Sequence, residues 1–169
     1  MKEILDKLAE KFGDAIVETA SFRGDETCVV RREKLLDVCR YLRDELSFDM
    51  MTDLCGADYP DRDLRFEVVY HLYSVDKAKR LRLKVRVPQT EAVVPSVCEI
   101  WKAANWFERE AFDLFGINFE GHPNLKRILC HHEFEGHALR KDYPKNRRGK
   151  VPTPDPLVDP LLCKEGEGR

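Results

Sequence analysis

The pattern of apolar and polar positions along the chain predicts a mixed α+β fold. Apolar residues recur at helical spacing over 3–12 and 32–46, which predicts two amphipathic helices. The predicted β-strands are the alternating runs 15–22, 26–31, 50–55, 64–73 and 80–87. A short helix is predicted at 96–103. We therefore expect a mostly antiparallel sheet with helices packed on one face.

The last predicted strand exposes a row of cations. Arg80, Arg82, Lys84 and Arg86 alternate with apolar residues, so they share the outward face. Such a row keeps an exposed strand soluble, or it contacts an acidic partner surface. The sequence leaves both alternatives open.

A longer helix, predicted to begin at Asn105, combines ionised and aromatic side chains. Asn105 and Glu108 have the spacing of a capping box, and Arg109 and Asp113 are four residues apart, as in a helical ion pair. Gly116 is a natural end for the helix. Ionised groups among aromatic residues must find partners, because burying them unpaired is costly. Those partners belong either to this chain or to something that docks on it.

Two motifs follow one another in this region. The first comprises Glu108, Arg109, Glu110, Asp113, Gly116, Phe119, Gly121, His122, Pro123, Arg127 and Leu129. The second runs from Gly136 to Pro144 and includes Arg140, Lys141, Asp142, Tyr143 and Pro144. Together they resemble the signature of the C subunit of respiratory complex I, the NADH–quinone oxidoreductase of bacteria and mitochondria. Ala138 stands where the family usually has proline, and the resemblance spans roughly 35–144.

The resemblance implies a hydrophilic subunit in the peripheral arm of a membrane-bound enzyme, at the cytoplasmic face of the inner membrane. Its expected partners are the large D subunit and the iron–sulfur B subunit, and the motif residues would form the partner interface. It implies no catalytic residue, metal or cofactor in this chain, because the iron–sulfur clusters, FMN and quinone belong to the assembled complex. An equivalent subunit of a membrane-bound nickel–iron hydrogenase or of a coenzyme F420 dehydrogenase is an alternative.

Composition excludes some other classes of protein. The 169 residues are 43% hydrophobic, which is enough for one core, and the net charge of −2 does not suit a nucleic-acid binder. No apolar run is long enough to span a bilayer, and we expect a soluble cytosolic protein that meets the membrane through its complex. The six cysteines form no C-x-x-C pair, which argues against an iron–sulfur or zinc framework.

A second alternative is a free-standing metal-dependent enzyme. The run from Cys130 to His137 contains the ligand types that metals prefer, including His131 and His132, and Glu108 and Asp113 could act as acid and base. The spacing matches no standard zinc motif, however, and no nucleophile lies nearby. Pairing with arginine explains these acids better.

The chain is predicted to divide into a domain, residues 1–143, and an extended proline-rich tail, residues 144–169. Five of the nine prolines fall between Pro144 and Pro160. Apolar residues such as Leu161 and Leu162 suggest that the tail becomes ordered along a neighbouring subunit. The basic stretch 140–150 could be a solvated linker, or it could contact anionic lipid or an acidic partner.

Overall fold

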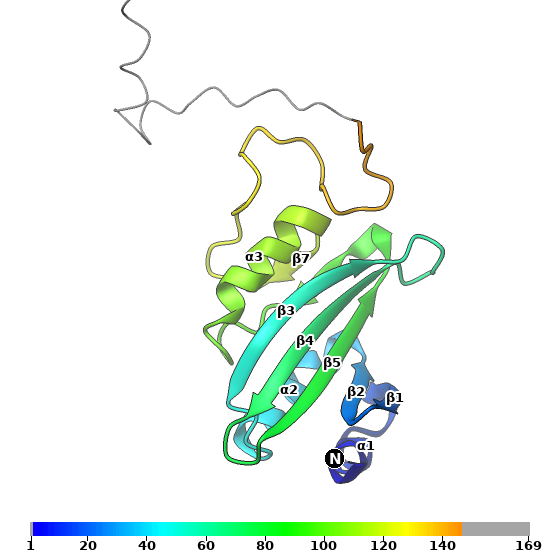
Figure 1. Cartoon of the computed structure of the whole chain (residues 1–169), viewed down its shortest axis with the longest axis vertical. Coiled ribbons are helices and arrows are strands. Elements are labelled where there is room, and N and C mark those ends of the chain that lie inside the picture. The colour runs from blue at the N-terminus through cyan, green and yellow to red at the C-terminus, as the bar shows by residue number, and fades with distance from the viewer. Residues whose placement is uncertain (1, 147–169) are drawn as a thin grey trace, which may run out of the picture.

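A five-stranded sheet forms the centre of the part of the chain that the computed structural model describes, residues 2–146 (Figure 1). Its strands are β1 (Ile16–Phe22), β2 (Asp25–Val30), β3 (Met50–Asp58), β4 (Phe66–Ser74) and β5 (Lys79–Val87). They lie in the order β1-β2-β5-β4-β3, and every neighbouring pair is antiparallel except β2 and β5. The predicted fold class is therefore confirmed. All of the predicted tail beyond residue 146 lies outside the described residues.

Three helices bury their apolar sides against one face of this sheet. They are α1 (Lys2–Phe12), α2 (Leu35–Asp44) and α3 (Ala104–Phe115), and Figure 1 shows α2 behind the strands. Leu8, Leu35 and Leu42 are fully buried in the same core as Val68 and Leu83 of the sheet. Each such side chain stabilises the fold by about 1.5–3 kcal/mol.

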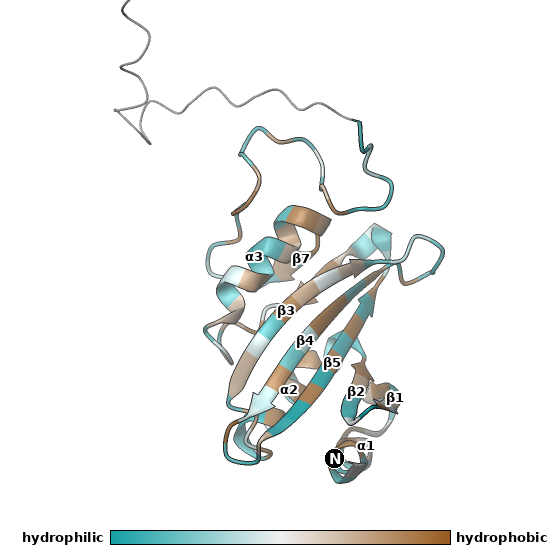
Figure 2. Cartoon of the chain, viewed as in Figure 1, coloured by the Kyte–Doolittle hydropathy of each residue, from teal (hydrophilic) through white to brown (hydrophobic). Residues whose placement is uncertain are grey.

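The other face of the sheet carries the predicted row of cations, which alternate with buried apolar residues along β5 (Figure 2). Glu67 of β4 is only 1% exposed and accepts hydrogen bonds from Lys84 (2.7 Å) and Arg86 (2.9 Å). Burial would raise the pKa of Glu67, but the two cations outweigh it and lower the pKa. Arg80, by contrast, has no ion-pair or hydrogen-bond partner within residues 2–146. The row is thus only partly neutralised by its own chain.

Some elements differ from the prediction. β3 does not end at residue 55 before Gly56, as predicted, but continues to Asp58. Gly56 is a strand residue without a side chain, and the ring of Phe115 lies where that side chain would be. The segment 96–103 forms turns instead of a helix. Two short strands, β6 (Val93–Pro95) and β7 (Asn118–Glu120), form a parallel pair that the sequence pattern did not indicate. Single-turn 3-10 helices at Gly13–Ala15, Arg32–Lys34 and Gln89–Glu91 complete the described elements.

Candidate functional site

The carboxylate of Asp113 organises the loop that follows α3. Asp113 is fully buried, and one oxygen accepts a hydrogen bond from Arg127 at 2.7 Å. The other oxygen accepts three consecutive backbone amides, from Ile128 (2.9 Å), Leu129 (2.8 Å) and Cys130 (2.8 Å). Burial alone would raise the pKa of Asp113, but these donors outweigh it and bring the pKa to about 2. Asp113 is therefore an ionised anchor for the loop.

The second motif caps the C-terminal end of α3. Three consecutive helix carbonyls accept hydrogen bonds from it: Asp113 from His137 Nδ1 (2.9 Å), Leu114 from the Leu139 amide (3.0 Å) and Phe115 from Arg140 Nε (2.6 Å). The chain leaves the helix at Gly116, whose φ of 71° is strained for any other residue. These last carbonyls have no partner inside the helix, and a cation at this end is favoured by the helix dipole. The two motifs therefore form one structural unit.

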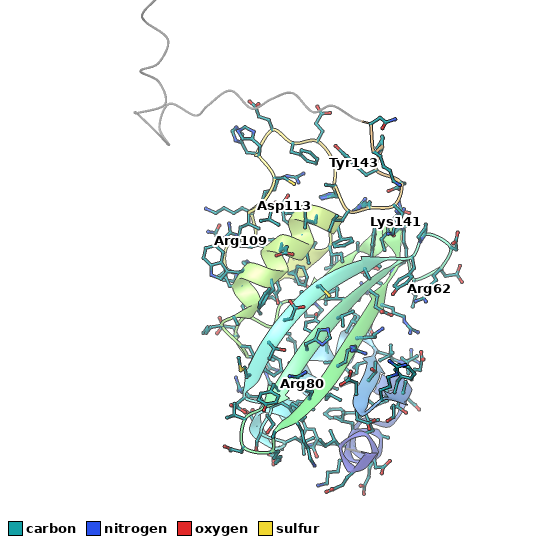
Figure 3. The ribbon with its side chains drawn as sticks, viewed as in Figure 1. Arg62, Arg80, Arg109, Asp113, Lys141 and Tyr143 are labelled. Atoms are coloured by element: carbon teal, nitrogen blue, oxygen red, sulfur yellow. The ribbon has the colours of Figure 1, made fainter. Side chains whose placement is uncertain are left out.

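A buried ion pair ties the second motif to the sheet. Arg65, at the start of β4, donates to both oxygens of Asp58 at 2.7 and 2.8 Å, and both side chains are almost fully buried. Arg65 also contacts the carboxylate of Asp142 at 3.0 Å, while the amide of Lys141 donates to Asp58 at 2.7 Å. The hydrogen bonds from Arg65 and Lys141 lower the pKa of Asp58. The loop is thus fixed at α3 and at the turn between β3 and β4 (Figure 3).

Comparison with known proteins identifies the family to which the chain belongs. The model of the family described as "Respiratory-chain NADH dehydrogenase, 30 Kd subunit" matches residues 28–149. The chain belongs to this family. The resemblance inferred from the two motifs is confirmed.

Relatives named as C subunits of NADH-quinone oxidoreductases match most of the chain. The C subunit of the NADH-quinone oxidoreductase of Geotalea uraniireducens is 46% identical over 138 residues, which cover 82% of this chain and 84% of the relative. The C subunit of the same enzyme from a Roseiflexus species is 50% identical over 143 residues, covering 83% and 82%. In residues 2–146 no helix combines the length and apolar character needed to cross a membrane.

Two solved structures share the fold. One is the trypsin-resistant fragment of Nqo5, with 33% identity and a TM-score of 0.65 over 73% of this chain and 98% of the fragment. The other is a chain in a membrane-bound sulfane sulfur reductase, an archaeal respiratory membrane complex. It is 29% identical, with a TM-score of 0.75 over 86% of each chain.

Two local interactions predicted inside the family's first motif are wrong. The helix begins at Ala104, one residue before Asn105, so Asn105 is not its cap. Glu108 instead accepts hydrogen bonds from Ser96 Oγ and the Val97 amide, both at 2.7 Å, and from the Cys98 thiol. Burial raises the pKa of Glu108, and these neutral donors do not outweigh it. Glu108 thereby holds the preceding turns in place.

Arg109 does not pair with Asp113 either. Its guanidinium donates to the carbonyls of Lys126 (3.1 Å) and Arg127 (3.2 Å) and lies 5.0 Å from the centre of the Trp106 ring. Because Asp113 contacts residues 127–130, the two side chains hold neighbouring parts of the same loop. Arg109 thus has a loop-positioning role similar to that of Asp113.

The remaining motif residues fall into two groups. One group shapes the local structure: Phe119 is buried in β7, Gly121 has φ 82° in an exposed turn, and His122 bridges the Asn105 carbonyl and the Asn124 amide. The exposed members, available to a partner, are Glu110, Pro123, Lys141, Asp142 and Pro144. Tyr143 stacks on Phe134 with ring centres 5.6 Å apart.

The ligand set of the alternative metal enzyme is not assembled. Among residues 2–146, two groups of three potential metal ligands have donor atoms near one another, and neither contains Asp113 or a residue from 131–137. The carboxylate of Asp113 is already engaged in the hydrogen bonds described above, so a metal would have to compete with them. His131 and His132 lie side by side with ring centres 4.1 Å apart, at the surface of the loop.

The buried pair Asp58–Arg65 was missed by reasoning from the sequence. Asp58 lies between the predicted strands 50–55 and 64–73, and Arg65 lies near the start of the second. A signal exists in hindsight: an acid and an arginine flank a tight turn between two apolar strands. Nothing in the spacing, however, indicates that Asp142 completes the pair from the other end of the chain.

Proposed function

We propose that this chain is a non-catalytic structural subunit in the peripheral arm of a proton-translocating NADH-quinone oxidoreductase. In this role it carries no electron itself, and it supports electron transfer from NADH through iron–sulfur clusters to quinone by bracing the subunits that hold them. The names of the relatives support the complex. The large D subunit and the iron–sulfur B subunit are the proposed neighbours, at the cytoplasmic face of the inner membrane. FMN, the clusters and quinone would be held by other subunits.

The main support for a structural role comes from the hydrogen bonds of two buried, ionised aspartates. Asp113 and Asp58 are buried and saturated with hydrogen bonds, and each holds a distant piece of backbone in place. A carboxylate with a pKa of about 2 does not accept protons near neutral pH. These residues therefore suit the shaping of a rigid surface, and fixed geometry is what electron transfer between neighbouring subunits requires.

The surface that they shape offers exposed apolar side chains. Trp106 of α3 is 62% exposed, and Leu129 and Leu139 of the loop are 61% and 50% exposed. Apolar and aromatic residues exposed beside polar ones are typical of the centre of a protein–protein interface. We place the partner contact here, with the exposed motif residues Glu110, Lys141 and Asp142 around it.

The test is co-purification from solubilised membranes with a tagged full-length chain. We expect the large D and iron–sulfur B subunits to co-purify, identified by mass spectrometry. Leu129→Asp and Leu139→Asp should reduce recovery of these partners strongly. The matched controls Phe22→Asp and Val75→Asp, at positions 70% and 55% exposed on other elements, should leave it unchanged. All four variants should keep the circular dichroism spectrum of the wild type.

Arg109→Ala should also reduce the recovery of the partner subunits, because it releases the loop that contains Leu129. Assembled complex should decrease, while turnover per assembled complex stays normal. Normal amounts of assembled but inactive complex would contradict the structural role, and so would a chain purified alone that turns over a substrate.

A second candidate is the equivalent position in another membrane-bound respiratory complex. The likeness to a chain of the sulfane sulfur reductase favours it, because that complex uses the same fold. The same co-purification separates the two: hydrogenase or reductase subunits in place of the subunits of an NADH-quinone oxidoreductase would establish the second candidate.

A further inference from the structure

Three side chains on the open face of the sheet bring oxygen, sulfur and nitrogen donors together. Asp53 and Cys55 occupy alternate positions of β3 and so share a face, and His71 of β4 lies directly across from Asp53. Their donor atoms all lie within 4.8 Å of one another. They are the ligand types that zinc and related transition metals take from proteins.

All three side chains are free to bind. Within residues 2–146, none of them has a hydrogen-bond or ion-pair partner. The other group with nearby donor atoms, Cys98, Glu108 and His122, differs in this respect. There Glu108 accepts three hydrogen bonds, and both ring nitrogens of His122 are engaged. Of the two groups, the one on the open face therefore offers lone pairs that no neighbour uses.

Two of the neighbouring cations interact with other groups, whereas the side chain of Arg80 has no such partner within residues 2–146. Arg82 lies next to His71 in the sheet, but its guanidinium extends towards β2, 3.4 Å from Thr27 Oγ1 and 3.8 Å from Asp25. Lys84 is paired with Glu67. Near the Cys55 sulfur, the negative charges of Asp53 and of Glu110 from α3 act together. Lys84 and Arg82 oppose these charges at Cys55, and Arg82 exerts the strongest charge effect on His71. A cation bound here would therefore be held by direct coordination to the three donors and not by the surrounding charges.

The group also has room for a further ligand. Asp53 and His71 line a hollow of about 700 Å³ that extends towards Met50, Tyr73 and Arg80. Zinc–ligand bonds place neighbouring donor atoms of a tetrahedral site about 3.3–3.8 Å apart, so small side-chain rotations would close this group around an ion. Three protein ligands would leave the fourth position open to the hollow.

We propose that Asp53, Cys55 and His71 form a binding site for a transition-metal cation of the zinc class. Binding replaces the S–H bond of Cys55 by a metal–sulfur bond, and the proton passes to solvent. The site is separate from the signature loop, so the proposal stands or falls independently of the role in assembly. It also contradicts the expectation, drawn from the family resemblance, that the chain holds no metal.

The test uses the purified full-length chain, stripped with a chelator and titrated with Zn²⁺ and then with Co²⁺. We expect one zinc per chain to survive desalting. With Co²⁺ we expect a thiolate charge-transfer band in the near ultraviolet. Cys55→Ser should abolish that band, and His71→Gln should weaken zinc binding by about tenfold or more. The matched controls Cys130→Ser and His132→Ala remove the same residue types elsewhere and should leave both signals unchanged.

Cys55 is exposed, so its replacement by serine does not threaten folding even if the His71 variant fails to fold. A stripped wild-type chain that retains no stoichiometric zinc would overturn the proposal. It would also be overturned if the cobalt band persisted in Cys55→Ser or disappeared in Cys130→Ser, because the sulfur ligand would then lie elsewhere.

Discussion

Asp113→Asn and Glu108→Gln make the same chemical change on one helix, and we expect opposite outcomes. Both carboxylates are fully buried in α3, and each substitution replaces one oxygen by an amide nitrogen. The difference lies in the donors. Asp113 is surrounded by a guanidinium and three backbone amides, whereas Glu108 accepts hydrogen bonds from neutral groups. The pKa of Asp113 is lowered, and that of Glu108 is raised by burial.

The size of the effect follows from these pKa values. The pKa of Asp113 falls from an ordinary 3.8 to about 2. At about 1.4 kcal/mol per pKa unit, the fold favours the ionised form of Asp113 by about 2 kcal/mol. Asp113→Asn loses this contribution and turns an amide group towards the donors of Arg127, so we expect a total loss of about 2–4 kcal/mol. Glu108→Gln supplies the uncharged form that burial already favours, and should change stability by less than about 1 kcal/mol.

The measurement is the free energy of unfolding of the full-length chain in urea at pH 7. The midpoint should fall clearly for Asp113→Asn and stay near that of the wild type for Glu108→Gln. Hydrogen exchange should show faster exchange of the Ile128, Leu129 and Cys130 amides in Asp113→Asn alone. Equal losses in the two variants would refute the reasoning, because they would show that burial, and not the charge of the donors, decides the cost.

Three further predictions concern the anchors of the loop. Gly116→Ala should lower the midpoint of thermal unfolding more than Gly121→Ala: both glycines have positive φ, but only at position 116 would a methyl group meet the side chains of the second motif. Arg65→Lys loses a bidentate contact and should cost about 1–3 kcal/mol in urea unfolding. Arg62→Lys should be nearly neutral, because the Arg62 side chain is half exposed and lies 3.8 Å from its acidic partner Glu67. Acid titration should show the contribution of Asp113 above about pH 4 and its loss as the pH falls towards 2, since its pKa is lower in the folded state; an Asp113→Asn variant that loses as much stability over this pH range as the wild type would contradict this.

Most of the sheet could be predicted because it depends on a simple alternation. Strands β4 and β5 have apolar residues at every second position, and the row of cations from Arg80 to Arg86 lies on the face where that period places it. Gly56 misled the prediction, because a glycine that ends a strand and a glycine that admits a ring from another element look the same in the sequence. The parallel pair of β6 and β7 joins two three-residue segments, which are too short for a periodic pattern.

The interior of the site could not be predicted from local spacing. The sequence indicated that Glu108, Arg109 and Asp113 need partners, but the helical rule matched Arg109 with Asp113. In the structure both residues contact the loop at 126–130 instead. An i,i+4 pair on an exposed helix contributes only about 0.3–0.5 kcal/mol, so a loop that offers three amides and a guanidinium to one carboxylate outcompetes it. Long-range competition of this kind leaves no trace in the spacing of the residues.

The two motifs depend on each other for a physical reason. The end of α3 leaves three carbonyls without helical partners, and the second motif supplies a donor to each of them. The second motif is in turn held by Asp58 and Arg65. A change at the β3–β4 turn should therefore alter the conformation of the second motif where it contacts the end of α3. Leu129 and Leu139, the exposed apolar residues of the loop, lie between these anchors in the chain. A partner that binds them would therefore meet a surface that has already lost its conformational freedom, which lowers the entropic cost of assembly.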